Sequence, residues 1–240
     1  MLKFKSMGKR PPRRWKQLGL QSQGTHGGWR DGAGRPRGRT TVARVARPEL
    51  SRHHPLHVTL RVRDDAPALR RSRAWATLRA AFRRGKDRFG FRLIHFSVQT
   101  NHIHLVCEAE DKRALTRGMQ GLAIRIARRM NRLAGRRGAF FADRYRARVL
   151  RTPRQVRNVL LYVLQHHAHH DARRAGLLDV YSSGLYFTGW LECMRLPLLD
   201  DGAPPVAAAT RWLLTTGWKR HGLIGIDETP REPAARSGQS

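Results

Sequence analysis

Apolar and polar side chains alternate from His57 to Val62, and this segment is rich in β-branched residues. Such alternation predicts a strand with one buried face. The segments 91–100 and 102–109 also carry strand patterns. Asn101 between them allows a tight turn, so the two segments are expected to pair as an antiparallel hairpin. A fourth strand is predicted over residues 138–150.

Helical spacing of the apolar residues separates these strands. It predicts one helix over 69–89 and a longer one from the N-cap residue Asp111 through residue 133. Thr152 precedes a proline that suits the first helical position, so a third helix should run from there to about residue 171. The order β-α-β-β-α-β with a helix appended predicts an α+β, ferredoxin-like split βαβ fold. We therefore expect an antiparallel sheet of roughly four to five strands, helices on one of its faces, and an appended C-terminal helix that bears Tyr162.

The two ends of the chain fall outside this pattern. Residues 1–50 hold few apolar residues and much Arg and Gly, so we expect a basic tail that is disordered when free. Within this tail, the segment that contains Arg35 and Arg37 is similar to an AT-hook, which inserts arginine into the narrow minor groove of A/T-rich DNA. A generic phosphate-binding tail is the alternative. Residues 191–240 are predicted to form a partly disordered extension with a short helix over 207–214.

Composition narrows the class of partner and the compartment. The chain has 48 Lys and Arg residues against 17 Asp and Glu residues, a net charge of +31, which favours nucleic acid as the partner. Most of the excess is arginine, which can fork onto phosphate and stack on bases. Two cysteines exclude a disulfide framework and a cysteine-based zinc site. No apolar run reaches the ~18 residues of a membrane span, and no signal-peptide pattern occurs, so we expect no membrane partner and a cytoplasmic protein.

A histidine pair in the third predicted strand is the first candidate site. His102 and His104 lie on one face of that strand, because side chains alternate, while Ile103 points to the opposite face. Two imidazoles on a rigid element make a metal-ligand pair that lacks a third donor. Ordinary surface or cross-strand histidines are the alternative interpretation.

The last predicted helix carries the second candidate cluster. Tyr162 and His166 lie one turn apart on the same helix face. Taken alone, Tyr162 could be a packing aromatic and the histidines a solvated helix end. Together with the strand histidines and the basic charge, they provide a metal site, a hydroxyl nucleophile and a phosphate-binding surface. Phosphodiester cleavage requires those three components.

Four motifs carry a resemblance to a known family. They are Thr100-Asn101-His102-Ile103-His104-Leu105, Met119-Gln120-Gly121-Leu122, Phe141-Ala142-Asp143-Arg144-Tyr145 and Tyr162-Val163-Leu164. With these motifs, residues 52–190 resemble the HUH transposases that use a single catalytic tyrosine, and specifically their REP-associated tyrosine transposase branch. The resemblance implies a transposase or nuclease domain over this range.

The resemblance also implies a mechanism and a substrate. His102, His104 and a polar residue one turn after the tyrosine would bind Mg²⁺ or Mn²⁺. Tyr162 would attack single-stranded DNA and form a 5′-phosphotyrosine link that strand transfer later reverses. The usual targets of the family are short DNA hairpins. The candidate phosphate contacts are Arg125, Arg128, Arg129, Arg144 and Arg148. The oligomeric state stays open, with a homodimer among the options.

One position departs from the family pattern. Where members usually carry Gln or Asn, this chain has His166, and imidazole suits Mg²⁺ less well than an amide oxygen does. We therefore expect His166 to be the third ligand and Mn²⁺ to support more activity than Mg²⁺. Gln165 is the alternative third ligand, although it points about 100° away on an ideal helix. Tyr145, flanked by arginines in the fourth predicted strand, is the rival nucleophile, although base stacking suits it better.

Two further classes of function compete with a nuclease. The first is a catalytically inactive protein of the same fold that binds hairpin DNA or RNA. RNA-binding sheets of this topology expose aromatic residues on their central strands, whereas this chain has His102 and His104 there. The second is a metallohydrolase of the His-x-His barrel type, for which the chain has too few predicted strands. A covalent protein–DNA adduct would separate the nuclease from both.

Overall fold

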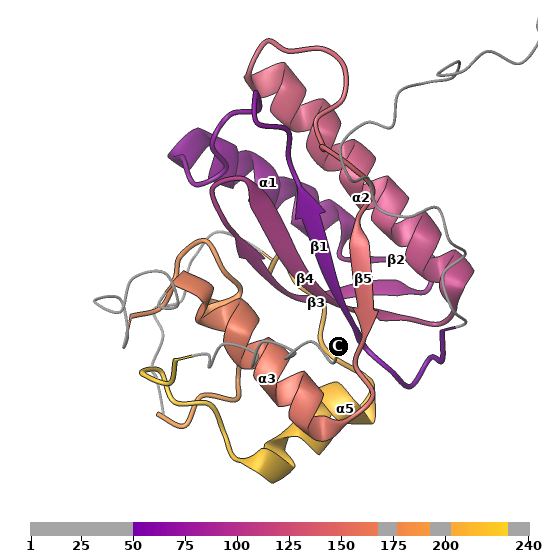
Figure 1. The fold of residues 1–240 in the computed structure, drawn as a ribbon, viewed down its shortest axis with the longest axis vertical. Helices are drawn as coiled ribbons and strands as arrows, with labels where there is room; N and C mark the ends of the chain where they lie inside the picture. The colour runs from indigo at the N-terminus through magenta and orange to yellow at the C-terminus, as the bar shows by residue number, and fades with distance from the viewer. Residues whose placement is uncertain (1–49, 168–176, 193–202, 230–240) are drawn as a thin grey trace, which may run out of the picture. The chain divides into compact units, whose positions relative to one another are not determined.

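The computed structural model describes residues 50–167, 177–192 and 203–229, which contain a five-stranded antiparallel sheet in the order β2-β3-β4-β1-β5 (Figure 1). All the neighbouring strands pair antiparallel. The strands are β1 Leu56–Arg61, β2 Asp87–Arg88, β3 Phe91–Val98, β4 His102–Ala109 and β5 Arg146–Val149. The order β3-β4-β1-β5 is that of a ferredoxin-like fold, with β2 added at one edge. The predicted α+β fold class is thereby confirmed.

The two helices that were expected to follow Asp111 and Thr152 begin at those caps, whereas the helix expected from residue 69 begins at Ser72. The helices are α1 Ser72–Gly85, α2 Lys112–Leu133, α3 Pro153–Leu164 and α5 Trp212–Thr215, with short 3₁₀ turns η2 Gly184–Tyr186 and η3 Gly217–His221. The Asp111 carboxylate accepts the Ala114 N–H at 2.6 Å, and the Thr152 hydroxyl accepts the Gln155 N–H at 3.2 Å. Within the described ranges, no helix combines the length and apolar character needed to cross a membrane.

Helices cover both faces of the sheet. One core joins α1 and α2 to the side chains of Val58, Leu60 and Leu105, which point to the same face. The opposite face is covered by α3, whose apolar residues pack with Ile94 and Val106. The expectation of helices on one face therefore holds for α1 and α2, and the appended helix α3 occupies the other face (Figure 1).

Two predicted boundaries are wrong for reasons of local pairing. The helix expected to reach residue 89 ends at Gly85, because Asp87 and Arg88 pair with β3 as β2. Phe89 and Gly90 form the turn, with φ of 58° and 74°, the left-handed values that tight hairpins require. The strand expected over 138–150 is limited to β5, and of its first part only Phe141 forms an isolated bridge, with Val62. Beside this bridge, the Ala142 N–H donates to the Arg61 carbonyl at 2.9 Å.

The C-terminal segment 203–229 first contacts the end of α1 and the sheet, through residues 203–211, and then packs against α3. Arg157 of α3 donates to both carboxylate oxygens of Glu228 at 2.7 Å and to the carbonyls of Gly222 and Leu223. Trp218 and Ile224 are buried in the same core as α3. The short helix predicted over 207–214 is limited to α5, because buried Glu108 of β4 accepts the N–H groups of Thr210 and Arg211 and holds them extended.

A buried ion pair fastens the chain after α3 to the sheet. Arg70 donates both terminal nitrogens to the Asp179 carboxylate, at 2.7 and 2.8 Å, and donates to the Val98 carbonyl. The Asp179 side chain is 3% exposed. We expect Asp179→Ala to lower the free energy of unfolding by about 3 kcal/mol, because it leaves the Arg70 side chain, which is only 19% exposed, without its carboxylate partner. Urea unfolding would measure this.

Asp65→Ala is the matched control for that substitution. Asp65 also pairs with arginines, Arg63 and Arg136, but its side chain is 55% exposed. Exposed ion pairs are screened by water and contribute little, so this variant should unfold almost as the parent does. Equal losses of stability in the two variants would contradict the role given to the Arg70–Asp179 pair.

Candidate metal and nucleophile site

Three histidines meet between the sheet and α3. His102 and His104 of β4 face the same side as α3, and Ile103 between them is fully buried against α1 and α2, as the alternation of the strand predicts. His166 joins them, and the potential ligand nitrogens of the three side chains all lie within 4.8 Å of one another. Three imidazoles at that separation can converge on one metal ion. This group is called the histidine cluster below.

The His102 ring is oriented by its neighbour in the turn. Nδ1 of His102 lies 2.9 Å from the side-chain oxygen Oδ1 of Asn101. Because an amide oxygen only accepts, His102 carries its proton on Nδ1 and leaves the Nε2 lone pair available as a ligand. Asn101, which the sequence suggested as a turn residue and as part of a family motif, therefore also sets the tautomer of a candidate ligand.

The His104 ring is oriented from β1. Its Nδ1 lies 3.2 Å from Nε2 of His57 and 3.3 Å from the hydroxyl of Thr59. These contacts hold the ring by Nδ1, as outer partners of metal-binding histidines commonly do, so Nε2 is the atom that would bind a metal ion. Neither His57 nor Thr59 was predicted from the sequence to belong to the site. Their polar face was visible in the alternation of 57–62, but the register that places Thr59 opposite His104 was not.

His57 is a neutral partner for His104 at ordinary pH. Burial, and to a lesser extent the nearby charge of Arg148, together lower the pKa of His57 to about 4. An uncharged His57 imidazole can form a hydrogen bond with His104 without placing a positive charge next to a cation site. The environment of His57 is therefore compatible with a bound metal ion.

Tyr162 lies directly against the histidine cluster. Its hydroxyl is 3.5 Å from Nε2 of His104, the outer limit of a hydrogen bond, and its ring centroid is 4.6 Å from that of His166. Burial raises the pKa of the Tyr162 phenol, so the hydroxyl is protonated at neutral pH. The side chain is half-buried, and a nucleophile in this position must lose its proton as it attacks.

His166 reaches the cluster through a break in the helix. The third helix was expected to continue to about residue 171, but α3 ends at Leu164, with Gln165 as its C-cap, and His166 and His167 are helical again. The Gln165 side chain is fully buried, and its amide nitrogen donates to the Ile226 carbonyl. The structure thus brings His166 to the strand histidines, while Gln165 is engaged with the C-terminal segment. Residues 168–171 lie outside the described ranges.

The remaining candidates are divided between the two faces of the sheet. Tyr145 is partly buried against the core that contains α1 and α2. Helix α2 packs on that same face of the sheet and carries the predicted phosphate contacts Arg125, Arg128 and Arg129. Arg148 pairs across the strands with His57 and therefore faces the histidine cluster. Arg144 is exposed just before β5, and Arg35 and Arg37 lie outside the described residues.

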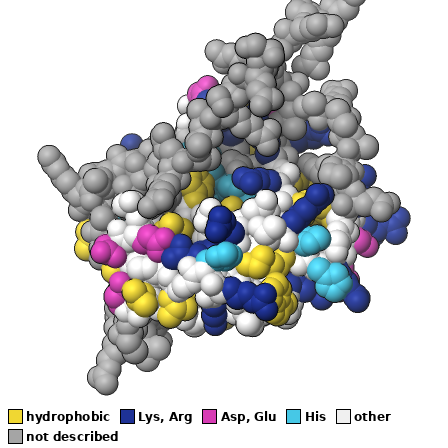
Figure 2. All heavy atoms as spheres, turned by 60° about the horizontal axis from the view of Figure 1, so that its bottom comes forward, with side chains coloured by type: hydrophobic (Ala, Val, Ile, Leu, Met, Phe, Trp, Pro, Cys, Tyr) yellow, Lys and Arg dark blue, Asp and Glu magenta, His cyan; other side chains and the backbone are white. Residues whose placement is uncertain are grey.

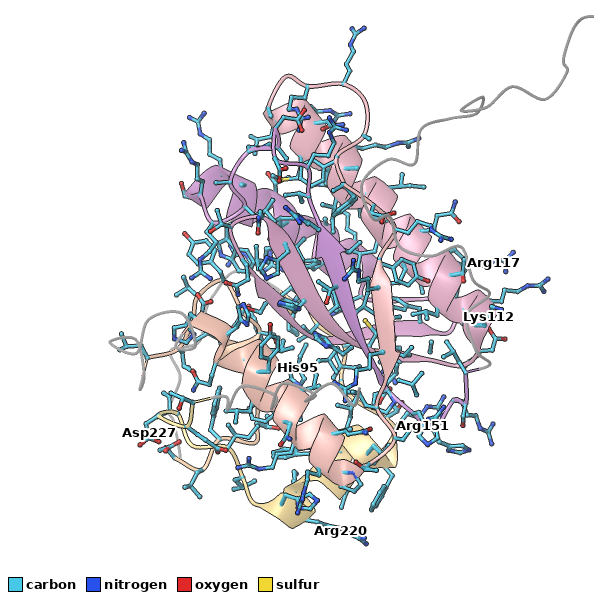
Figure 3. The ribbon with its side chains drawn as sticks, in the orientation of Figure 1. His95, Lys112, Arg117, Arg151, Arg220 and Asp227 are labelled. Carbon is cyan, nitrogen blue, oxygen red and sulfur yellow. The ribbon has the colours of Figure 1, made fainter. Side chains whose placement is uncertain are left out.

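Several basic and histidine side chains lie away from the histidine cluster. Figure 3 shows His95 beside α3, and Lys112 and Arg117 projecting outward from α2. His95 is buried, its Nδ1 lies 3.1 Å from the Ser183 hydroxyl, and burial lowers its pKa to about 4. On the face drawn in Figure 2, Lys and Arg side chains lie around several histidines.

A family model and several solved structures are similar to parts of this chain. Residues 51–166 match the family model described as "Transposase IS200 like". A REP-associated tyrosine transposase solved with a REP hairpin bound is similar at 14% identity and a TM-score of 0.47, over 59% of this chain and 82% of that one. A candidate transposase from Deinococcus radiodurans R1 is similar at 16% identity and a TM-score of 0.35, over 47% of this chain and 87% of that one. No curated protein matches the chain. The family match begins before β1 and ends at His166, so it contains the whole histidine cluster and Tyr162.

Proposed function

Residues 51–166 make this chain a member of the IS200-like transposase family, and from that premise we propose that it cleaves and rejoins single-stranded DNA with Tyr162 as nucleophile. One observation carries the proposal. The Tyr162 hydroxyl lies 3.5 Å from His104, inside a cluster of three histidines on one face of the sheet. A hydroxyl beside a candidate cation site is the arrangement that covalent phosphodiester cleavage needs.

The proposed reaction conserves the energy of the phosphodiester bond. The Tyr162 oxygen attacks the scissile phosphorus, the bond to the 3′ oxygen breaks, and the phenol loses its proton while the leaving oxygen gains one. The product is a 5′-phosphotyrosine link and a free 3′-hydroxyl. Attack by a 3′-hydroxyl on that link reverses the step, restores the diester and releases Tyr162, so strand transfer needs no external energy source.

The histidine cluster fits a divalent metal ion. His102, His104 and His166 would hold it, and Asn101, His57 and Thr59 already orient two of the three rings. When bound, the ion would supply Lewis-acid polarisation and orientation of the scissile phosphate. Three imidazoles suit Mn²⁺ and later transition metals better than Mg²⁺, which prefers oxygen ligands. We therefore favour Mn²⁺.

Hairpin targets and the REP-associated branch are part of the same proposal. They rest on the motifs at 100–105 and 162–164. The basic charge of the chain supports a nucleic-acid substrate of some kind but does not choose its shape. A binding protein of the same fold that has lost cleavage is the second candidate.

Labelled hairpin oligonucleotides with single-stranded flanks test the proposal. The protein is incubated with DNA and Mn²⁺, then denatured in SDS. A 5′-phosphotyrosine link retains the DNA on the 3′ side of the cut, so a 3′ label should migrate with the protein and a 5′ label should appear on a shorter free strand. Binding without an adduct for either label would select the inactive binding protein instead.

The identity of the third ligand has its own prediction. We expect His166→Ala to weaken Mn²⁺ binding at least about tenfold, since even outer partners of metal ligands are worth that much. His166→Asn replaces the imidazole with an amide and should raise the ratio of Mg²⁺-supported to Mn²⁺-supported cleavage. Isothermal titration and cleavage rates in the two metals measure these effects.

His167→Ala is the control for the His166 variants. His167 follows in the chain, but its Nε2 lies 2.9 Å from the Leu177 carbonyl, away from the cluster. It should keep the Mn²⁺ affinity of the parent. An unchanged affinity in His166→Ala, or equal cleavage rates of the parent in both metals, would contradict the assignment of His166.

A further inference from the structure

We propose that Arg146 and Arg148 of β5, with Arg61 at the end of β1, form a phosphate-binding track that holds a single DNA strand beside the histidine cluster. The proposal rests on the function proposed above and specifies which surface receives the substrate. It selects three of the many arginines of the chain by their position in the sheet.

The strand register places these arginines. Arg148 pairs with His57, and Arg146 pairs with Thr59. Paired residues of antiparallel strands project to the same face, with Cβ atoms roughly 5 Å apart. His57 and Thr59 both contact Nδ1 of His104, so this face is the one that carries the cluster.

Arg61 extends the track at the other end of the cluster. It pairs across the strands with His102, so it also projects to the face of the histidines. Its guanidinium lies 3.3 Å from the Asp64 carboxylate, but the two side chains are 64% and 73% exposed. An exposed pair of this kind is weak and can yield to a phosphate. Arg146 and Arg148 therefore border the histidine cluster beside β1, and Arg61 borders it at the end of β1.

The track is open to a ligand. Arg146 and Arg148 are exposed, and β5 is an edge strand of the sheet. Across the described residues, no carboxylate lies within ion-pair distance of either guanidinium. Two unneutralised arginines beside a candidate cation site repel each other and the cation, and a bound polyanion would relieve that repulsion.

The chemistry of the track suits a nucleic-acid backbone. Residues two apart on a strand lie about 6.8 Å from each other, a separation that lets two guanidiniums contact successive phosphates of an extended strand. Each guanidinium can donate two parallel hydrogen bonds to one phosphate. The arginines of α2 cover the opposite face of the sheet, so they cannot serve the same segment of DNA at the cluster.

A salt titration of DNA binding tests the track. Binding of a fluorescein-labelled single-stranded oligonucleotide is followed by anisotropy in EDTA, where binding is separated from cleavage. Arg146→Ala/Arg148→Ala should reduce the slope of log K against log salt by about 1.4, since each phosphate contact to a single strand contributes about 0.7. At 0.1 M salt its affinity should fall on the order of tenfold. Arg146→Lys/Arg148→Lys should keep most of the slope, because it keeps the charge.

The matched control removes the same charge from the other face. The control is the double variant Arg113→Ala/Arg117→Ala. Both residues belong to α2, and Arg117 projects away from the sheet (Figure 3). The salt slope of this variant should equal that of the parent. Titration of Mn²⁺ should show that the β5 variant binds the ion at least as tightly as the parent, because two charges that repel the cation have been removed. If the parent forms no covalent adduct but the β5 variant still shows the reduced salt slope, the proposed function would be rejected and the phosphate-binding track would stand. An unchanged slope in the β5 variant, or an equal loss in the α2 variant, would overturn the track.

Discussion

We expect Tyr162→Phe to abolish the covalent protein–DNA adduct under conditions in which the parent forms it. The substitution removes only the hydroxyl, which lies 3.5 Å from His104 and is the atom that would attack the phosphate. No other group of the cluster can form a stable phosphodiester link, so the loss should be complete rather than partial. The measurement is the fraction of 3′-labelled hairpin DNA that migrates with the protein in SDS.

Tyr145→Phe is the control for this variant. Tyr145 is partly buried against the other core of the sheet, so removing its hydroxyl should leave the adduct yield close to that of the parent. Tyr162→Phe should also keep its Mn²⁺ affinity, which would show that the cluster has not collapsed. An adduct that survives in Tyr162→Phe and disappears in Tyr145→Phe would transfer the role of nucleophile to Tyr145.

His104→Ala should remove both metal binding and cleavage. His104 occupies the centre of the site, because its ring lies within reach of His57, His102, His166 and Tyr162. Loss of an outer partner of a metal-binding histidine costs about 10- to 100-fold in affinity, so loss of the ligand itself should cost at least about a hundredfold. Isothermal titration with Mn²⁺ and the adduct assay would show the two losses together.

His221→Ala controls for the general effect of losing a histidine. His221 is exposed at the end of η3 and belongs to no cluster of potential ligands in the described part of the chain. It should bind Mn²⁺ as the parent does. If His104→Ala kept the parent affinity, the three histidines would be a packing group and the proposed metal dependence would fail.

The fold was predictable where local patterns and tertiary packing agree. The strand 102–109 and the helix after Asp111 have the expected bounds, because a turn residue and an N-cap coincide with a change in apolar spacing. The short strands β5 and β2 were not predictable in this way. Their bounds depend on which residues of β1 and β3 they pair with, and pairing partners are not encoded in a local window.

The sequence predicted the residue types of the site, but it did not predict their full arrangement in space. The alternation of β4 placed His102 and His104 on one face, and the spacing of four residues brought His166 close to Tyr162. The helix break at Gln165 was not visible, because it depends on the contact of that side chain with residue 226. The contribution of His57 depends on the register between β1 and β4, which only the folded sheet defines.

The packing of residues 212–229 against α3 has a practical consequence for any work on the isolated domain. The family match ends at residue 166, so a fragment cut there would contain every residue of the candidate site and would look complete by sequence. It would nevertheless lack Trp218, Ile224 and the Glu228 partner of Arg157, and would leave the outer side of the tyrosine-bearing helix in water. An expression boundary chosen from the family alone would thus remove the support of the candidate nucleophile while keeping the nucleophile itself.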